Sequence, residues 1–240
     1  MLKEAIEYIV GMKNPDIQQI KDQIYSDKEL HRISYIPRAS AIEMNTLSSL
    51  VDYIKANVDD LGGKMIIHIQ SPTEVALYSS LDRERRREYL VNVNARIPSF
   101  PFNQFIDHET FCINVQSIFI DNNNTDRALL LKFAGTVEGG TVAEYGDDGI
   151  TQKATVKTGI ASKGEALVPN PVNLQSYRTF IEVDQPVTSF IFRMKQDKYD
   201  GISCALFEAD GGAWMIDAMN SIKLYLEEQL ADTEGYTIIS

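Results

Sequence analysis

The chain has 240 residues, of which 44% are hydrophobic and 24% are charged, and its formal net charge is −11. A chain of this length can bury a large core without disulfides or a structural metal. No apolar run reaches the roughly 18 residues that a membrane helix needs. An acidic surface also argues against non-specific binding of duplex DNA, which depends on Lys and Arg at the phosphates. These properties exclude a disordered or membrane-spanning chain and favour a protein partner, a small ligand or self-association.

The N-terminal residues and the cysteines indicate the compartment. Residues 1–24 place acids and lysines among the apolar residues, whereas a signal peptide needs an unbroken apolar stretch and a cleavage site. Cys112 and Cys204 lie inside apolar segments, which is typical of buried thiols in a reducing compartment. We therefore expect a cytoplasmic protein.

Apolar residues at helical spacing predict four helical regions. Residues 2–10 and 15–24 predict a helical hairpin at the N-terminus. A longer helix over residues 47–61 is capped by Asn45 or Thr46 and ended by Gly62 and Gly63. Asp107 can cap a helix over residues 108–119, and Asp210 can cap a closing helix. The tail after that helix is expected to be either an edge strand or a loose end.

Strand patterns fill most of the remaining sequence. Alternating or continuous apolar runs predict strands in residues 65–70, 74–81, 88–97, 127–137, 141–146, 150–159, 178–183, 187–195 and 202–209, with turns at 147–149 and 200–201. The fold class is therefore α+β, with mixed, mostly antiparallel sheets, an N-terminal helical region and a C-terminal helix. We expect a single domain over residues 1–240, with a subdivision into 1–120 and 127–240 as the alternative.

Two groups of residues could bind an anion or an acidic partner. Arginines are concentrated in one inter-strand segment, at Arg83, Arg85, Arg86 and Arg87, although interleaved acids weaken its positive field. Tyr177 and Arg178 follow a loop that two prolines make rigid enough to present a recognition surface. A solvated loop and a structural crossover are the corresponding structural interpretations.

Carboxylates form the alternative acidic site. Two pairs lie at predicted strand ends, where acid-base or magnesium chemistry could be built: Glu182 with Asp184, and Glu208 with Asp210. Asp184 is equally explained as a turn residue and Asp210 as a helix cap.

Other reactive residue types form no recognisable catalytic set. His108 and Cys112 would share a helix face, but no further pair completes a metal site. Gly211 and Gly212 lack a phosphate-binding motif around them. We therefore predict no metal, no cofactor and no catalytic residues.

A family resemblance is carried by the segments DDGITQKATVKTG, VPNPVNLQSYRTF, QPVTSFIFR and ALFEADGGAW, and by the earlier segments IQSPTEVALYSSLDRERRR and FPFNQFIDHETF. In these segments the chain resembles the uncharacterised YfdQ-like family, which bacteriophages and prophages encode. The resemblance covers most of the chain. It implies a phage or prophage origin near replication and recombination genes, and it supplies no catalytic residues.

Three hypotheses follow. The leading one is a non-enzymatic phage accessory protein in the cytoplasm of the bacterial host. It would act through self-assembly as a homo-oligomer, or by binding a host or phage protein, in replication, recombination or host takeover. The second is a metal-dependent phosphodiesterase or nuclease that uses the four carboxylates. The third is a nucleotide-binding sponge in which the arginine segment joins Tyr177 and Arg178 in one anion pocket.

Overall fold

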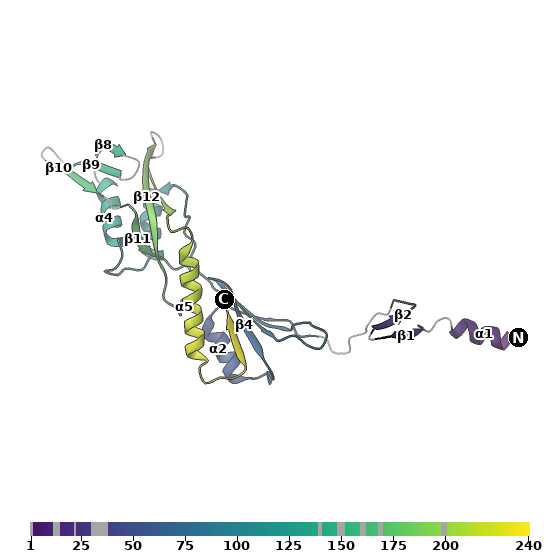
Figure 1. Ribbon diagram of the computed structural model, residues 1–240. Helices are drawn as coiled ribbons and strands as arrows, with labels where there is room; N and C mark the ends of the chain where they lie inside the picture. The colour runs from purple at the N-terminus through teal and green to yellow at the C-terminus, as the bar shows by residue number, and fades with distance from the viewer. Residues whose placement is uncertain are drawn as a thin grey trace. The chain divides into compact units, whose positions relative to one another are not determined.

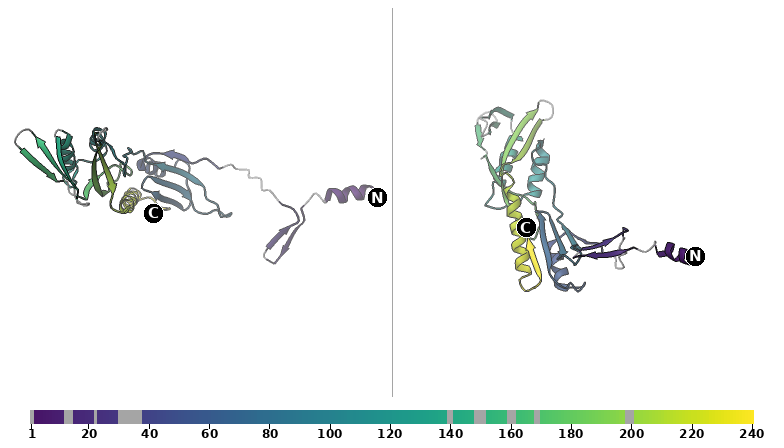
Figure 2. Two further views of the ribbon diagram at one scale, coloured as in Figure 1. Left: turned by 90° about the horizontal axis from the view of Figure 1, so that it is seen from above. Right: turned by 45° about the vertical axis from the view of Figure 1, so that its right-hand side comes forward.

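The computed structural model describes residues 2–11, 15–21, 23–29, 38–138, 141–147, 152–158, 162–167, 170–197 and 201–240. It contains two compact units, residues 1–39 and residues 40–240, which are treated separately below (Figures 1 and 2). The predicted boundary near residues 121–126 falls inside the second unit. The predictions of a single domain and of its alternative subdivision stay predictions.

In its described residues, the N-terminal unit has one helix and one β-hairpin. Helix α1 (Leu2–Gly11) follows the predicted helical spacing, whereas β1 (Ile17–Ile20) and β2 (Gln23–Ser26) form an antiparallel pair. The prediction of a second helix over residues 15–24 is therefore wrong. Lys21 has a φ of 58°, the left-handed conformation that tight hairpin turns use. Ile17 and Ile20 lie before this turn and Ile24 lies after it, although the spacing of the three also fits a helix.

The first core of the second unit lies against a five-stranded sheet in the order β14-β4-β5-β6-β3. Its strands are β3 (Ile42–Met44), β4 (Met65–Ser71), β5 (Glu74–Ser79), β6 (Tyr89–Asn94) and β14 (Tyr236–Ile239). The pairs β4–β5 and β5–β6 are antiparallel. The two outer pairs, β14 with β4 and β3 with β6, are parallel. The C-terminal tail thus adds an edge strand, one of its two predicted forms.

Buried and partly exposed residues alternate along β4 and β6, so one face of this sheet is buried. Met65, Ile67 and Ile69 are buried, while the residues between them are partly exposed. The register places Ile67 beside Leu77, and Leu77 beside Val91, so that the apolar side chains of three strands share one face. Helices α2 (Leu47–Ala56) and α5 (Ala213–Gln229) contribute their buried residues to the same core.

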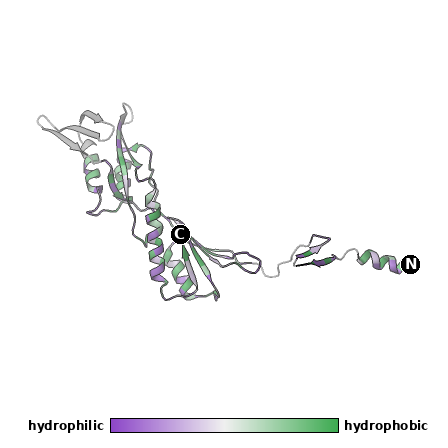
Figure 3. Ribbon diagram, viewed as in Figure 1, coloured by the Kyte–Doolittle hydropathy of each residue, from purple (hydrophilic) through white to green (hydrophobic). Residues whose placement is uncertain are grey.

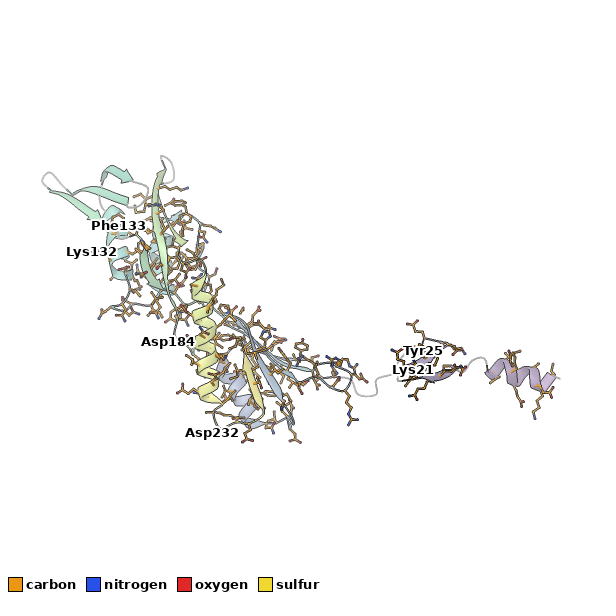
Figure 4. All side chains as sticks on the ribbon, viewed as in Figure 1. Lys21, Tyr25, Lys132, Phe133, Asp184 and Asp232 are labelled. Atoms are coloured by element: carbon orange, nitrogen blue, oxygen red, sulfur yellow. The ribbon has the colours of Figure 1, made fainter. Side chains whose placement is uncertain are left out.

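The second core is built on a four-stranded antiparallel sheet in the order β11-β12-β13-β7. Its strands are β7 (Ile106–Asp107), β11 (Val172–Gln175), β12 (Val187–Asp197) and β13 (Gly201–Glu208). Helices α3 (His108–Ile118) and α4 (Arg127–Glu138) pack against it. Phenylalanines dominate this core, and Figure 4 labels one of them, Phe133 of α4. The rings of Phe102 and Phe190 are stacked, with their centroids 5.2 Å apart.

A third sheet is formed by β8 (Thr141–Asp147), β9 (Gln152–Thr158) and β10 (Ser162–Leu167), in the order β10-β9-β8. Both pairings are antiparallel, which confirms the predicted pairing of the strands at 141–146 and 150–159. Residues 148 and 149 of the predicted turn between them, and residue 200 of the turn predicted at 200–201, lie outside the described residues.

Two predicted strands of the second unit are wrong. Residues 127–137 form α4, because Leu130, Phe133 and Ala134 face the core at helical spacing and Ala, Leu and Lys favour helices. Residues 178–183 form a loop whose backbone is held by a buried glutamine, described below. Helix α2 also ends earlier than predicted, at Asn57, whose φ of 45° provides a left-handed cap.

The predicted fold class is confirmed. The chain is α+β, with mostly antiparallel sheets, an N-terminal helix and a C-terminal helix. Among the described residues, no helix combines the length and apolar character needed to cross a membrane.

Asp107 caps α3 as predicted, which makes the stability of the chain depend on pH. The amide of Thr110 donates to Oδ1 of Asp107 at 2.9 Å, and hydrogen bonds from Thr110 hold the pKa of Asp107 below its ordinary value of 3.8. A lowered folded-state pKa stabilises the fold above that ordinary value, and the stabilisation is lost as the pH falls through the folded pKa. We therefore expect Asp107→Ala to lower the free energy of unfolding at neutral pH. The difference in this free energy between wild type and variant should become smaller in acid. Urea unfolding of both proteins across a pH series measures this difference, and a constant difference would contradict the prediction.

Candidate functional site

The candidate site is centred on the loop of residues 176–186, which folds around the buried side chain of Gln185. Its Oε1 accepts hydrogen bonds from the amides of Arg178 at 2.9 Å and Thr179 at 3.1 Å. Its Nε2 donates to the carbonyls of Phe180 at 2.9 Å and Val183 at 3.2 Å. The backbone of this loop lacks the regular hydrogen bonds of a helix or sheet, and buried backbone groups need partners. The Gln185 side chain supplies partners for four of them. The loop is therefore an ordered element that can hold Arg178 in place.

Arg178 is buried, with only 8% of its surface exposed. Its Cζ lies 3.7 Å from the ring centroid of Trp214 and 4.5 Å from that of Phe102. Its Nη2 forms an ion pair with Oε1 of Glu208. Cation–π contacts and a charge-assisted hydrogen bond thus hold the guanidinium between the second core and the start of α5. Its positive charge is balanced by Glu208.

A pocket of about 240 Å³ lies beside Arg178. Its walls include Pro98, Phe100, Phe102 and Trp214, so they are mainly apolar. Ser176 and Arg178 also line it. Two of their atoms, Ser176 Oγ and Arg178 Nη1, are buried and have no hydrogen-bond partner among the described residues.

A second pocket, of about 360 Å³, adjoins the first, because Ile97, Pro98 and Tyr177 line both. Glu182 lies in its wall. Oε1 of Glu182 accepts hydrogen bonds from the amide of Ser48 at 3.2 Å and from Ser48 Oγ at 3.3 Å, in the first turn of α2. A carboxylate at this end of a helix complements the helix dipole, so Glu182 has a structural role there.

The predicted arginine segment lies elsewhere. Arg83, Arg85, Arg86 and Arg87 belong to the connection between β5 and β6, and none of them lines the two pockets. Arg86 pairs with Glu84 and with Asp82, the latter at 3.7 Å. Arg87 lies over the ring of Tyr78 and donates to the carbonyl of Ser79 at 3.0 Å. The structure thus brings Tyr177 and Arg178 together at the pockets and places the arginine segment outside their walls.

The four predicted carboxylates have four different environments. Glu208 pairs with Arg178, and Glu182 contacts α2. Asp210 accepts hydrogen bonds from the amides of Gly212 at 3.0 Å and Trp214 at 3.3 Å at the start of α5, but Gly212, not Asp210 as predicted, occupies the N-cap position. Asp184, labelled in Figure 4, is exposed on the loop. Across the described ranges, no three His, Cys, Asp or Glu side chains gather closely enough to hold a metal ion.

The histidine and thiol groups belong to the second core. Cys112 Sγ lies 3.6 Å from His108 Nε2, as their spacing on a helix predicted, and the same nitrogen lies 3.1 Å from the carbonyl oxygen of Ala134. Cys204 is fully buried in β13, and this burial raises its pKa to about 12. At neutral pH Cys204 is therefore a thiol, which is a poor nucleophile.

Some residues of the site carry no signal in the sequence. Gln185, Ser176 and Phe102 are common residue types in positions that match no motif, and their roles depend on contacts with distant residues. Trp214 is the one tryptophan of the chain, and no motif marks its position.

Comparisons with known proteins place no name on this site. A scan against protein-family models, a search of curated proteins and a search of solved structures each returned no match.

Proposed function

We propose that the chain is a non-enzymatic accessory protein that associates with copies of itself through its N-terminal unit. One observation carries this proposal: α1 and the β1–β2 hairpin bury none of their residues. Apolar side chains that a folded element leaves in water favour association.

Three exposed apolar residues of α1 lie at helical spacing and form an apolar face. Leu2 is 80% exposed, and Ile6 and Ile9 are 53% and 60% exposed. Figure 3 shows hydrophobic and hydrophilic bands alternating along this helix. A ten-residue helix is marginal in water by itself, and so is a two-stranded hairpin. Both elements would therefore gain stability from a surface that covers their apolar side chains.

The distribution of charge favours a second copy of the chain as the covering surface. Residues 1–39 contain six Lys or Arg and six Asp or Glu, so their formal charge is zero, and residues 40–240 carry the whole net charge of −11. Copies of the acidic part repel one another at low ionic strength, whereas copies of the neutral part do not. Self-association through the N-terminal unit, residues 1–39, therefore joins the parts of the chain with the least repulsion.

The double variant Ile6→Asp/Ile9→Asp is expected to abolish this association, because it places charge on the apolar face of α1. Size-exclusion chromatography with light scattering should give a multiple of the 27.0 kDa chain mass for the wild type and the single-chain mass for the variant. Lys3→Gln changes the net charge by one unit but keeps the apolar face, so this control should assemble like the wild type. A wild type that stays monomeric at the highest attainable concentration would contradict the proposal.

The resemblance to the YfdQ-like family supports a phage or prophage setting for this assembly, in the cytoplasm of a bacterial host. The acidic residues 201–240, with seven carboxylates and the single Lys223, suit contact with a basic host or phage protein, including one that handles nucleic acid. This part of the proposal concerns the partner of the assembled protein and is separate from the interface between copies.

A further inference from the structure

The pocket beside Arg178 combines apolar walls with two lining residues that each have one buried polar atom without a partner among the described residues. Ser176 is fully buried, Arg178 is more than nine-tenths buried, and both line the pocket. Ser176 Oγ and Arg178 Nη1 have no hydrogen-bond partner in the described part of the chain. Buried donors of this kind are unfavourable unless something accepts their hydrogen bonds. Two residues that line one pocket thus each carry an unsatisfied donor, which suits a ligand that carries an acceptor.

The charge balance restricts that acceptor. Arg178 already pairs with Glu208, so the guanidinium and carboxylate together are neutral. Dianions such as phosphate need more compensating positive charge than this pair provides, and Arg83, Arg85, Arg86 and Arg87 do not line the pocket. A single carboxylate suits the site, since it can accept from a guanidinium N–H and from a hydroxyl at once.

The size and walls of the pocket restrict the rest of the ligand. Its volume, about 240 Å³, is below the range of roughly 300–1,000 Å³ that is usual for drug-sized ligands. Pro98, Phe100 and Phe102 provide apolar and aromatic surface. One planar ring would bury its faces there, as aromatic groups do.

We propose that this pocket binds a small monocarboxylate with one planar apolar ring. The carboxylate accepts hydrogen bonds from Arg178 Nη1 and Ser176 Oγ, and the ring packs against the apolar walls. This site is independent of the N-terminal unit, so it goes beyond self-association. It also differs from a nucleotide site, because the arginine segment takes no part.

Trp214 lines the pocket and is the only tryptophan, so tryptophan fluorescence reports on the surroundings of this one residue. Titration of the full-length protein with phenylacetate should give a saturable change in this fluorescence. Phenylacetamide, which keeps the ring and lacks the charge, should bind more weakly, and inorganic phosphate should cause no change. A phosphate response equal to that of phenylacetate would overturn the proposal, as would the absence of saturation with phenylacetate.

Ser176→Ala should weaken phenylacetate binding about tenfold, because it removes one hydrogen bond to a charged group. Thr188→Val is the matched control. Thr188 is also fully buried with an unsatisfied hydroxyl, but it does not line the pocket. Equal affinities of the two variants would overturn the assignment of Ser176. The three ligands measured on the wild type test the proposal even if Ser176→Ala does not fold.

Discussion

Arg178→Met is expected to lower the free energy of unfolding by about 3 kcal/mol, because it breaks a largely buried ion pair. The variant leaves the Glu208 carboxylate without its partner and removes the cation from the faces of Trp214 and Phe102. Glu208 keeps 31% of its side-chain surface exposed, so water relieves part of the loss and the effect lies at the lower end of the range for buried pairs. Urea unfolding followed by far-UV circular dichroism measures the difference.

Arg86→Met is the matched control for this prediction. Arg86 also pairs with carboxylates, those of Asp82 and Glu84, but 53% of its side chain is exposed. Exposed pairs contribute little, so the expected loss is below about 1 kcal/mol. If the two variants were equally stable, Arg178 would have no special part in holding the loop of residues 176–186 against the second core.

Truncation of a buried side chain in either core of the second unit is expected to have the largest effect of all. Phe192→Ala should cost about 4 kcal/mol, and Leu77→Ala about 3 kcal/mol, through lost burial and the cavities that remain. Phe192 is fully buried beside Phe111 and Phe133, and Leu77 is fully buried in the five-stranded sheet. Both values can be measured by urea unfolding with circular dichroism and Trp214 fluorescence as parallel probes.

The same two variants test whether residues 40–240 unfold as one domain. Helix α5 has Ile222 and Leu226 in the first core, while Trp214 at its start contacts Arg178 beside the second core. The hydroxyl of Thr179 also donates to the carbonyl of Pro72. These connections favour a single cooperative transition that either variant shifts for both probes. Separate transitions, each shifted by only one variant, would indicate two domains.

Local patterns predicted much of this fold. The alternation of Met65, Ile67 and Ile69 predicted β4, and Thr46 and Asp107 provide the capping hydrogen bonds expected of them. Local patterns failed where two periods fit the same residues. The isoleucines at 17, 20 and 24 fit a helix but belong to a hairpin, and the run around Leu130 fits a strand but forms α4.

The candidate site was less predictable than the fold. Tyr177 and Arg178 were identified from the rigid loop before them, but Glu208, Trp214 and Phe102 reach Arg178 from distant parts of the chain. Spacing along a sequence gives no distance between such residues. The fold of residues 178–183 was missed for the same reason, since it depends on Gln185, whose type alone gives no sign of four hydrogen bonds.

The parallel pairing of β14 with β4 affects how quickly the five-stranded sheet can form. Tyr236 lies beside Met65, so the last ladder of this sheet joins segments separated by most of the chain. Contacts between such distant segments require a large loss of chain entropy before they form, and they slow folding. Until β14 arrives, the apolar strand β4 has an open edge that can pair with another chain. Expression at reduced temperature or with a chaperone should therefore improve the yield of soluble protein.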